Sequence, residues 1–194
     1  MTTVFIGGSR RITRLSQAIQ SRLDNIIDKG FTVVVGDANG VDKSVQKYFA
    51  SKHHKNVVVF CMGGACRNNI GNWETRNISP QSAKRDFNYY ATKDIQMANE
   101  ASCGFMIWDA KSKGTLNNII NLLKRQKKVL VYVSLDKSFS TLHSMEDLFP
   151  LLTKCDKKTV ERFKKELAIT HLMLHQQIDL EFARHNEQIG HPLP

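Results

Sequence analysis

The sequence predicts an α/β protein with a Rossmann-like, doubly wound parallel sheet of about five strands and a C-terminal helical extension. Two observations predict this class. Short apolar runs alternate with segments whose apolar residues recur at helical spacing, which is typical of parallel sheets with right-handed crossovers. Three of these runs are followed by polar, glycine- or hydroxyl-bearing turns, the kind of turn that binds ligands at the carboxyl ends of parallel strands.

Five apolar runs are the expected strands. The second is continuous and rich in β-branched residues, which is typical of a strand buried on both faces. Helices are expected between the runs, and the first ends at Lys29-Gly30 because glycine commonly terminates a helix. The expected strands are 3–6, 31–35, 57–60, 104–108 and 129–133.

The turn after the fourth run is the strongest candidate for a binding site. Ser112, Gly114 and Thr115 fall in the first turn of the helix that follows, where backbone N–H groups lack intrahelical partners. Gly114 lets an anion approach the backbone closely, and the two hydroxyls can donate hydrogen bonds. The alternative is an ordinary helix cap, since Ser and Thr cap many helices.

The turns at 7–11 and 36–42, after the first and second runs, are also polar and contain glycines. Because the carboxyl ends of parallel strands share one edge, we expect all three turns to gather there and form an anion site. The sequence has neither the dinucleotide-binding glycine fingerprint nor a Walker lysine. The candidate ligand-binding residues of these two turns are Gly7, Gly8, Ser9, Arg10, Gly36, Asp37, Gly40 and Asp42.

Residues 62–84 form a polar, Gly- and Asn-rich segment without clear periodicity, which we expect to be a long loop. Trp73 and Arg76 within it are candidate ligand-binding residues, because an exposed Trp favours a lid over the ligand. A Trp that anchors the loop to the core is an alternative of equal weight.

Four motifs together resemble the SLOG superfamily. They are Phe-Ile-Gly-Gly-Ser-Arg at 5–10, Gly-Asp-Ala-Asn-Gly-Val-Asp at 36–42, Lys-Asp-Ile-Gln-Met-Ala at 93–98, and Trp-Asp at 108–109 through Gly-Thr at 114–115. This Rossmann-like group includes the Lonely Guy cytokinin-activating enzymes, the YpsA-type proteins and the DNA-processing protein of natural transformation. The YspA/YpsA-like branch has the nearest pattern, and the resemblance covers about residues 3–133.

The resemblance implies a nucleotide or nucleotide-derived ligand whose phosphate sits on the turn of Gly114 and Thr115. It also places Gly7, Ser9 and Arg10 beside that phosphate. Lonely Guy enzymes carry Pro-Gly-Gly-x-Gly-Thr-x-x-Glu at this turn, and Asn118 stands at the position of their catalytic glutamate. An amide cannot act as a general base or stabilise an oxocarbenium ion as a carboxylate does.

Other carboxylates could supply the chemistry that Asn118 cannot. Asp109 and Glu74 are the catalytic candidates. Asp86 and Asp94 could also supply a carboxylate, and Asp94 is a candidate ligand-binding residue. A structural role is the alternative for each. Asn118 itself is a candidate ligand-binding residue, because its amide can hydrogen-bond a ribose hydroxyl.

The net charge of +10 is unevenly spread. Residues 110–165 hold 13 Lys/Arg against 5 Asp/Glu, which suggests an anionic partner such as a nucleotide, a nucleic acid or an acidic surface. An ordinary solvated surface is the alternative, and it is the usual explanation of scattered lysines. No run of 18 apolar residues exists, so no membrane partner is expected, and neither is a signal peptide. The four cysteines form no Cys-x-x-Cys motif, and three of them lie in or near apolar runs, which favours reduced thiols and a cytoplasmic location.

The expected domains are a Rossmann-like nucleotide-binding domain over 1–136 and a helical extension over 137–194. Residues 156–188 read as one long helix with two apolar stripes, more than a solvated surface helix needs. The helix therefore packs on the sheet or pairs with a second subunit, and we expect a homo-oligomer. His171 and His175 are four apart but no carboxylate completes a metal motif, so neither a metal nor a cofactor is expected.

The predicted function is the binding or sensing of a nucleotide-like small molecule at a phosphate site formed by the turns. A nucleotide N-glycosidic hydrolase of the Lonely Guy type is the second hypothesis. Single-stranded nucleic-acid binding is the third, because no series of aromatic residues accompanies the lysines. Whether the chain is an enzyme stays open.

Overall fold

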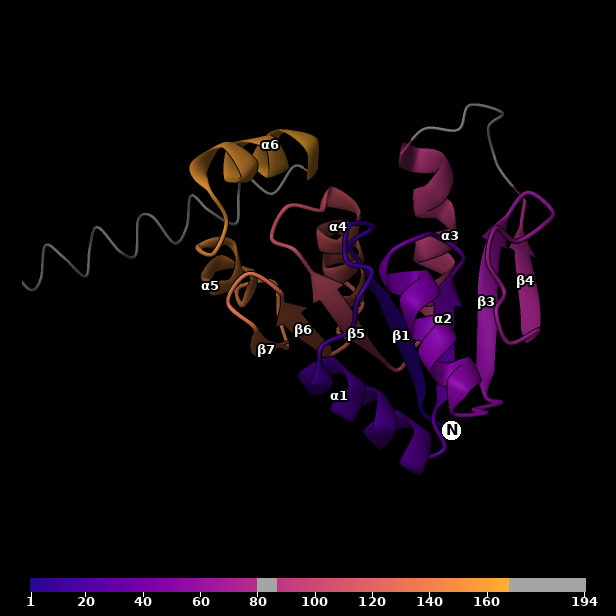
Figure 1. The fold of residues 1–194 in the computed structure, drawn as a ribbon. Coiled ribbons are helices and arrows are strands. Elements are labelled where there is room, and N and C mark those ends of the chain that lie inside the picture. Colours follow the sequence, from indigo (N-terminus) through magenta and orange to yellow (C-terminus); the bar gives the residue numbers. More distant parts are fainter. Residues whose placement is uncertain (80–86, 168–194) are drawn as a thin grey trace, which may run out of the picture. The chain divides into compact units, whose positions relative to one another are not determined.

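The structure is a computed structural model, and it describes residues 1–79 and 87–167. Within these residues one sheet has seven strands (Figure 1). The α/β, Rossmann-like class is confirmed, and the expected number of five strands is wrong. The strands are β1 (Thr3–Gly8), β2 (Thr32–Gly36), β3 (Val57–Met62), β4 (Glu74–Ile78), β5 (Cys103–Trp108), β6 (Val129–Val133) and β7 (Ser138–Leu142).

The strand order is β4-β3-β2-β1-β5-β6-β7. All neighbouring strands from β4 to β6 pair in parallel, and β7 pairs antiparallel with β6. The chain leaves β1 toward β2 on one side and later returns to add β5 on the other side. The order therefore reverses between β1 and β5, which is where sheets of this kind bind ligands.

Within the described residues, four helices cover the sheet. They are α1 (Gln17–Asp28), α2 (Val41–Ser51), α3 (Phe87–Glu100) and α4 (Lys113–Leu123). The buried residues of α1 and α2 share one apolar cluster with alternate residues of the central strands, and both helices lie in front of the sheet in Figure 1. Helices α3 and α4 contact each other. The crossovers that contain α3 and α4 run along the sheet in the direction opposite to those that contain α1 and α2. Because crossovers are right-handed, α3 and α4 lie on the other face of the sheet.

The two unpredicted strands are polar edge strands. Four of the five residues of β4 are exposed, and the strand lies inside the segment expected to be a loop. Strand β7 lies beyond residue 136, the expected end of the sheet domain, and only Leu142 in it is buried. An edge strand pairs on one side only and tolerates polar residues on it, so neither strand has the apolar run that identified the others.

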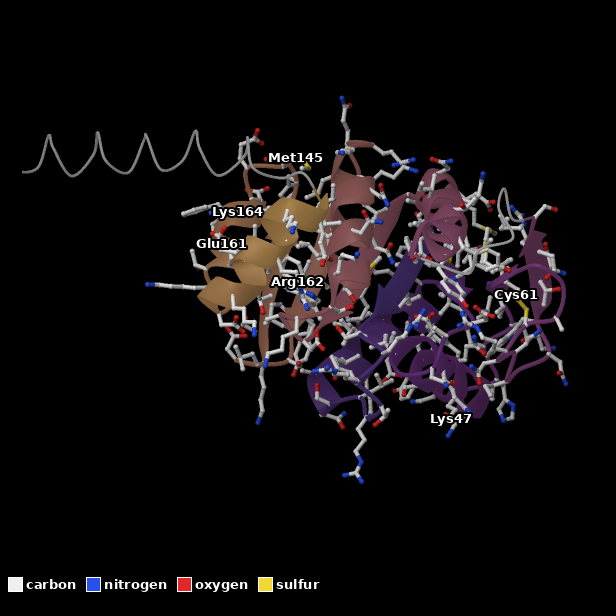
Figure 2. All side chains as sticks on the ribbon, turned by 90° about the horizontal axis from the view of Figure 1, so that it is seen from above. Lys47, Cys61, Met145, Glu161, Arg162 and Lys164 are labelled. Carbon is white, nitrogen blue, oxygen red and sulfur yellow. A yellow bond between two sulfur atoms is a disulfide. The ribbon has the colours of Figure 1, made fainter. Side chains whose placement is uncertain are left out.

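The chain divides into two compact units, residues 1–144 and 145–194. The second unit contains α5 (Leu148–Leu152) and α6 (Lys157–Leu167). On α6, Lys164 and Glu161 form an ion pair of 2.8 Å (Figure 2). The rest of the predicted helix over 156–188, with His171 and His175, lies outside the described residues. None of the described helices is both long and apolar enough to cross a membrane.

The cysteines differ from expectation at two positions. Cys61 and Cys66 are joined by a disulfide, whose yellow bond is visible beside the Cys61 label in Figure 2. Cys103 is a free thiol. The expectation of reduced thiols is therefore wrong for the first pair. The strand-to-loop turn brings their Cα atoms to 5.1 Å, a separation that a disulfide spans.

Candidate functional site

Ser9 lies at the point where the strand order reverses. It directly follows β1 and is fully buried. Its Oγ donates to Asp109 Oδ1 over 2.8 Å and lies 3.4 Å from Thr115 Oγ1, while the Asp109 N–H donates back to Ser9 Oγ over 3.1 Å. Asp109 and Thr115 come after β5, so the adjacency of β1 and β5 brings these three polar side chains together.

The start of α4 is capped by its own neighbours. Ser112 Oγ accepts the N–H of Thr115 over 3.3 Å. Asp109 Oδ1 accepts the N–H groups of Lys111 and Ser112 over 3.0 Å and 2.7 Å. The capping alternative raised by the sequence is thus present. The space where a Gly114 side chain would stand is open, because no atom comes within 4 Å of it.

Asn118 has an unsatisfied acceptor. It follows Thr115 by three residues, so the two side chains lie on the same side of α4. Asn118 is 7% exposed, and its Oδ1 has no hydrogen-bond partner in the described structure. Asn121 Nδ2, one helical turn further along α4, is likewise buried without a hydrogen-bond partner among the described residues.

The turn over residues 36–42 lies against the turn that follows β1. Gly40 has φ of +80°, and a Cβ there would collide with the backbone of Arg10. The Val41 N–H donates to the Ser9 carbonyl oxygen over 3.3 Å. A Cβ on Gly8 would collide with the Ile107 carbonyl and with Val41. The three turns singled out from the sequence therefore meet around Ser9.

Asp37 is held by Arg67 of the β3–β4 loop. Its carboxylate accepts the Arg67 backbone N–H over 3.1 Å and two guanidinium N–H groups over 3.0 Å and 2.6 Å. Burial alone would raise the pKa of Asp37, but the bonds from Arg67 and the charge of Lys93 outweigh it and lower the pKa. Asn68 Nδ2 also donates to the Asp37 carbonyl oxygen over 2.7 Å.

A buried lysine joins the other carboxylates of this edge. Lys93 Nζ lies 3.2 Å from Asp94 Oδ1 and 3.9 Å from Asp37 Oδ1. Lys93 Nζ and Asp42 Oδ2 both lie in the space that a side chain on Gly36 would occupy. Burial raises the pKa of Asp42 to about 6. The positive charge of Lys93 opposes this rise, and the negative charges of Asp94 and Asp37 add to it.

Two guanidinium groups contact one aromatic ring. Arg10 lies 5.4 Å and Arg67 lies 5.1 Å from the centre of the Tyr90 ring. Arg10 is exposed and forms no ion pair within the part of the chain that the structure describes. Arg10 is thus a cation at the carboxyl edge without a carboxylate partner among the described residues.

The structure places three predicted site residues elsewhere. Strand β4 runs parallel to β3, so Trp73 and Glu74 lie at its amino end, away from the carboxyl edge. The Trp73 indole donates to the His54 carbonyl over 2.9 Å and packs on the core, which fits the anchor alternative rather than a lid. Arg76 pairs with Glu100 and lies 3.7 Å from Glu74. None of them joins Ser9 and Asp109.

Sequence reasoning missed four residues of this edge: Arg67, Asn68, Tyr90 and Lys93. Arg67 and Asn68 lie in the polar segment 62–84, where the sequence predicts Trp73 and Arg76 as ligand-binding residues instead. Lys93 begins one of the motifs that carry the family resemblance, and in that motif the sequence predicts only its neighbour Asp94 as a ligand-binding residue. Among the described residues, no group of three or more His, Cys, Asp or Glu side chains could hold a metal ion.

Comparison with known proteins adds one finding. No protein-family model matches the sequence, and no curated protein matches it either. The fold resembles that of DNA processing protein A from Helicobacter pylori. The two share 16% identity with a TM-score of 0.51, over 86% of this chain and 80% of that one. The work on that protein concerns a unique mode of binding single-stranded DNA.

This likeness shows the fold alone. DNA-processing proteins are among the groups named for the resemblance, so the resemblance is supported at the level of the fold. Its finer assignment to the YspA/YpsA-like branch is a proposal.

Proposed function

We propose that this chain binds a nucleotide or nucleotide-derived ligand at the carboxyl edge of β1 and β5. The observation that carries the proposal is the meeting of the Ser9 and Thr115 side chains, 3.4 Å apart, at the point where the strand order reverses. Ligands of doubly wound sheets bind at this point. The backbone at Gly114 is open in front of it.

The polar groups of the site suit the two halves of a nucleotide. Arg10 is an exposed cation beside the turns and suits a phosphate. Asn118 carries an amide, which can donate to or accept from a sugar hydroxyl.

We propose binding rather than rapid cleavage of the glycosidic bond. Asn118 offers no charge to a developing oxocarbenium ion. Asp109 Oδ1 already accepts three hydrogen bonds, from Ser9, Lys111 and Ser112. These three bonds tie Asp109 Oδ1 into the turn before α4, so its role there is structural. Chromatography of a nucleotide panel incubated with the protein is expected to show little free base.

The test is calorimetry with a panel of nucleoside monophosphates. Thr115→Asp places a negative charge beside Ser9 and the start of α4, and we expect it to weaken binding by about 1–3 kcal/mol. Thr75→Asp is the matched control, because Thr75 is exposed on the edge strand β4 and should leave the affinity unchanged. Equal affinities of wild type and Thr115→Asp would reject the site.

The second candidate function is binding of single-stranded nucleic acid. It is favoured by the contacts of Arg10 and Arg67 with the Tyr90 ring, because arginines and aromatic rings are the groups that hold phosphates and stacked bases. The net charge of +10 and the DNA-binding protein of similar fold point the same way.

Salt dependence separates the two candidates. Oligonucleotide binding should weaken steeply as salt rises, because each neutralised phosphate releases counterions. We expect no submicromolar oligonucleotide complex at physiological salt. Should one form, Arg10→Gln should weaken it more than Arg14→Gln, since both arginines are exposed but only Arg10 contacts Tyr90. That result would place nucleic acid ahead of nucleotides.

A further inference from the structure

We propose that Cys61 and Cys66 form a redox-active pair that a dithiol reductant opens, and that the closed pair holds Arg67 in the polar edge around Asp37. The proposal does not depend on the nature of the ligand. It rests on the position of the disulfide in the β3–β4 loop, on the unequal burial of its two cysteines, and on the contacts of the residue that follows it.

The disulfide closes a short ring at the carboxyl end of β3. Cys61 belongs to the strand, and Cys66 comes five residues later. Gly63 and Gly64 both have positive φ and let the chain turn back on itself. The Gly63 N–H donates to the Ile78 carbonyl oxygen over 3.1 Å, so the ring is also fixed to β4.

The residues directly after the ring form the polar edge. Arg67 makes three hydrogen bonds to Asp37 and contacts the Tyr90 ring. Asn68 donates to the Asp37 carbonyl oxygen and to Asn39. Because Cys66 adjoins Arg67 in the chain, the disulfide fixes the backbone from which the guanidinium reaches Asp37.

The two cysteines differ in exposure. Cys61 is fully buried, whereas Cys66 is partly exposed. An attacking thiolate therefore meets Cys66 first. A disulfide that is partly open to solvent at one end is a substrate for thiol–disulfide exchange with a small dithiol.

One thiolate of the dithiol attacks Cys66 Sγ, a mixed disulfide forms, and the Cys61 sulfur leaves as a thiolate that takes up a proton. The second thiol of the reductant then attacks its own sulfur in the mixed disulfide. Cys66 leaves and is protonated, the dithiol becomes a cyclic disulfide, and the protein has gained two electrons and two protons.

Opening the ring should act locally. A ring this short removes little freedom from the unfolded chain, so its loss should leave the seven-stranded sheet folded. The loop over residues 63–70 gains conformations when the tether is lost. Holding Arg67 against Asp37 then costs more entropy, so these contacts should open more often.

The test is hydrogen exchange read by mass spectrometry on a Cys103→Ser/Cys155→Ser background, in which only this pair can react. Dithiothreitol under native conditions should raise the mass by about 2 Da. Amides of residues 63–70 should then exchange roughly tenfold faster, while those of β1 and β5 stay unchanged. A pair that resists native reduction, or reduction without faster exchange in the loop, would overturn the proposal.

A second variant gives an independent readout. Cys66→Ser on the same background should show the fast loop exchange without reductant and should not respond to dithiothreitol. Arg67→Gln with the disulfide intact should leave reduction unchanged in extent, because Arg67 is held by the pair and does not form it. If reduction instead accelerated exchange throughout β1, β2 and β3, the disulfide would be a structural tie of the whole sheet and the proposal would fail.

Discussion

At the scale of single residues, the buried charges around Lys93 are unequal in number. The carboxyl groups of Asp37, Asp42 and Asp94 face two cations, Lys93 and Arg67. Asp37 is tied to Arg67, and Asp94 is close to Lys93. Asp42 accepts the Ala38 N–H over 3.2 Å, in addition to the attraction of Lys93. A proton on Asp42 balances the group, which agrees with its raised pKa.

Asp42 should make the stability of the protein depend on pH. Its pKa rises from 3.8 to about 6 on folding, so the folded state holds this proton more tightly than the unfolded state. The contribution is fully present below pH 3.8 and is lost as the pH rises toward 6, by up to about 3 kcal/mol. Urea unfolding between pH 4 and 7 should show this fall in wild type and lack it in Asp42→Asn. Parallel curves for the two proteins would contradict the assignment.

The residues of the site were predictable only where local turn chemistry reveals them. Ser9, Gly40 and Thr115 stand in glycine- or hydroxyl-bearing turns after apolar runs, and such turns are visible in the sequence. Arg67 and Lys93 are not, because the partner of each comes from a distant part of the chain. A lysine in a helix looks solvated until the fold buries it beside Asp37 and Asp94.

At the scale of elements, two glycines of the turns differ in what their backbone requires. Gly40 has φ of +80° and ψ of −129°, a conformation that side chains rarely adopt, and it touches Arg10. Gly114 lies in α4 with open space around its Cβ position. The first glycine is thus needed for the fold, while the second keeps the site open.

Alanine at each position should separate these roles. Gly40→Ala should destabilise the protein by about 1–3 kcal/mol, from backbone strain. Gly114→Ala should stabilise it by up to about 1 kcal/mol, because alanine favours a helix. The same variant should weaken nucleotide binding if ligands approach the backbone there. Chemical unfolding and calorimetry on both variants give the two readouts, and a stable Gly40→Ala would show that the turn can rearrange.

Strand prediction succeeded in the centre of the sheet and failed at its edges. Strands β1, β2, β3, β5 and β6 are buried by helices on both faces, so each appears as an apolar run. Strand β4 has the sequence Glu-Thr-Arg-Asn-Ile and is held by pairing with β3 and by the Trp73 anchor beside it. Neither contact produces a repeating apolar pattern within the five residues of β4, so the sequence of this segment resembles that of a loop.

At the scale of the whole molecule, the expected homo-oligomer rests on the two apolar stripes of residues 156–188. Of this segment the structure describes α6, whose residues Thr159 and Phe163 are buried. A helix with two apolar stripes needs cover on more than one side. We expect sedimentation equilibrium to show at least a dimer, and a monomer at high micromolar concentration would contradict this.

The division of the chain into two units leads to a prediction about folding. All seven strands and the apolar cluster under α1 and α2 lie within residues 1–144. A continuous core of this kind is what a domain needs to fold alone. The fragment 1–144 should therefore unfold cooperatively on heating when followed by circular dichroism, with the far-ultraviolet spectrum of an α/β protein. A fragment that melts gradually, or exposes apolar surface to a dye at room temperature, would show that residues 145–194 complete the core, and the two units would then form one cooperative body.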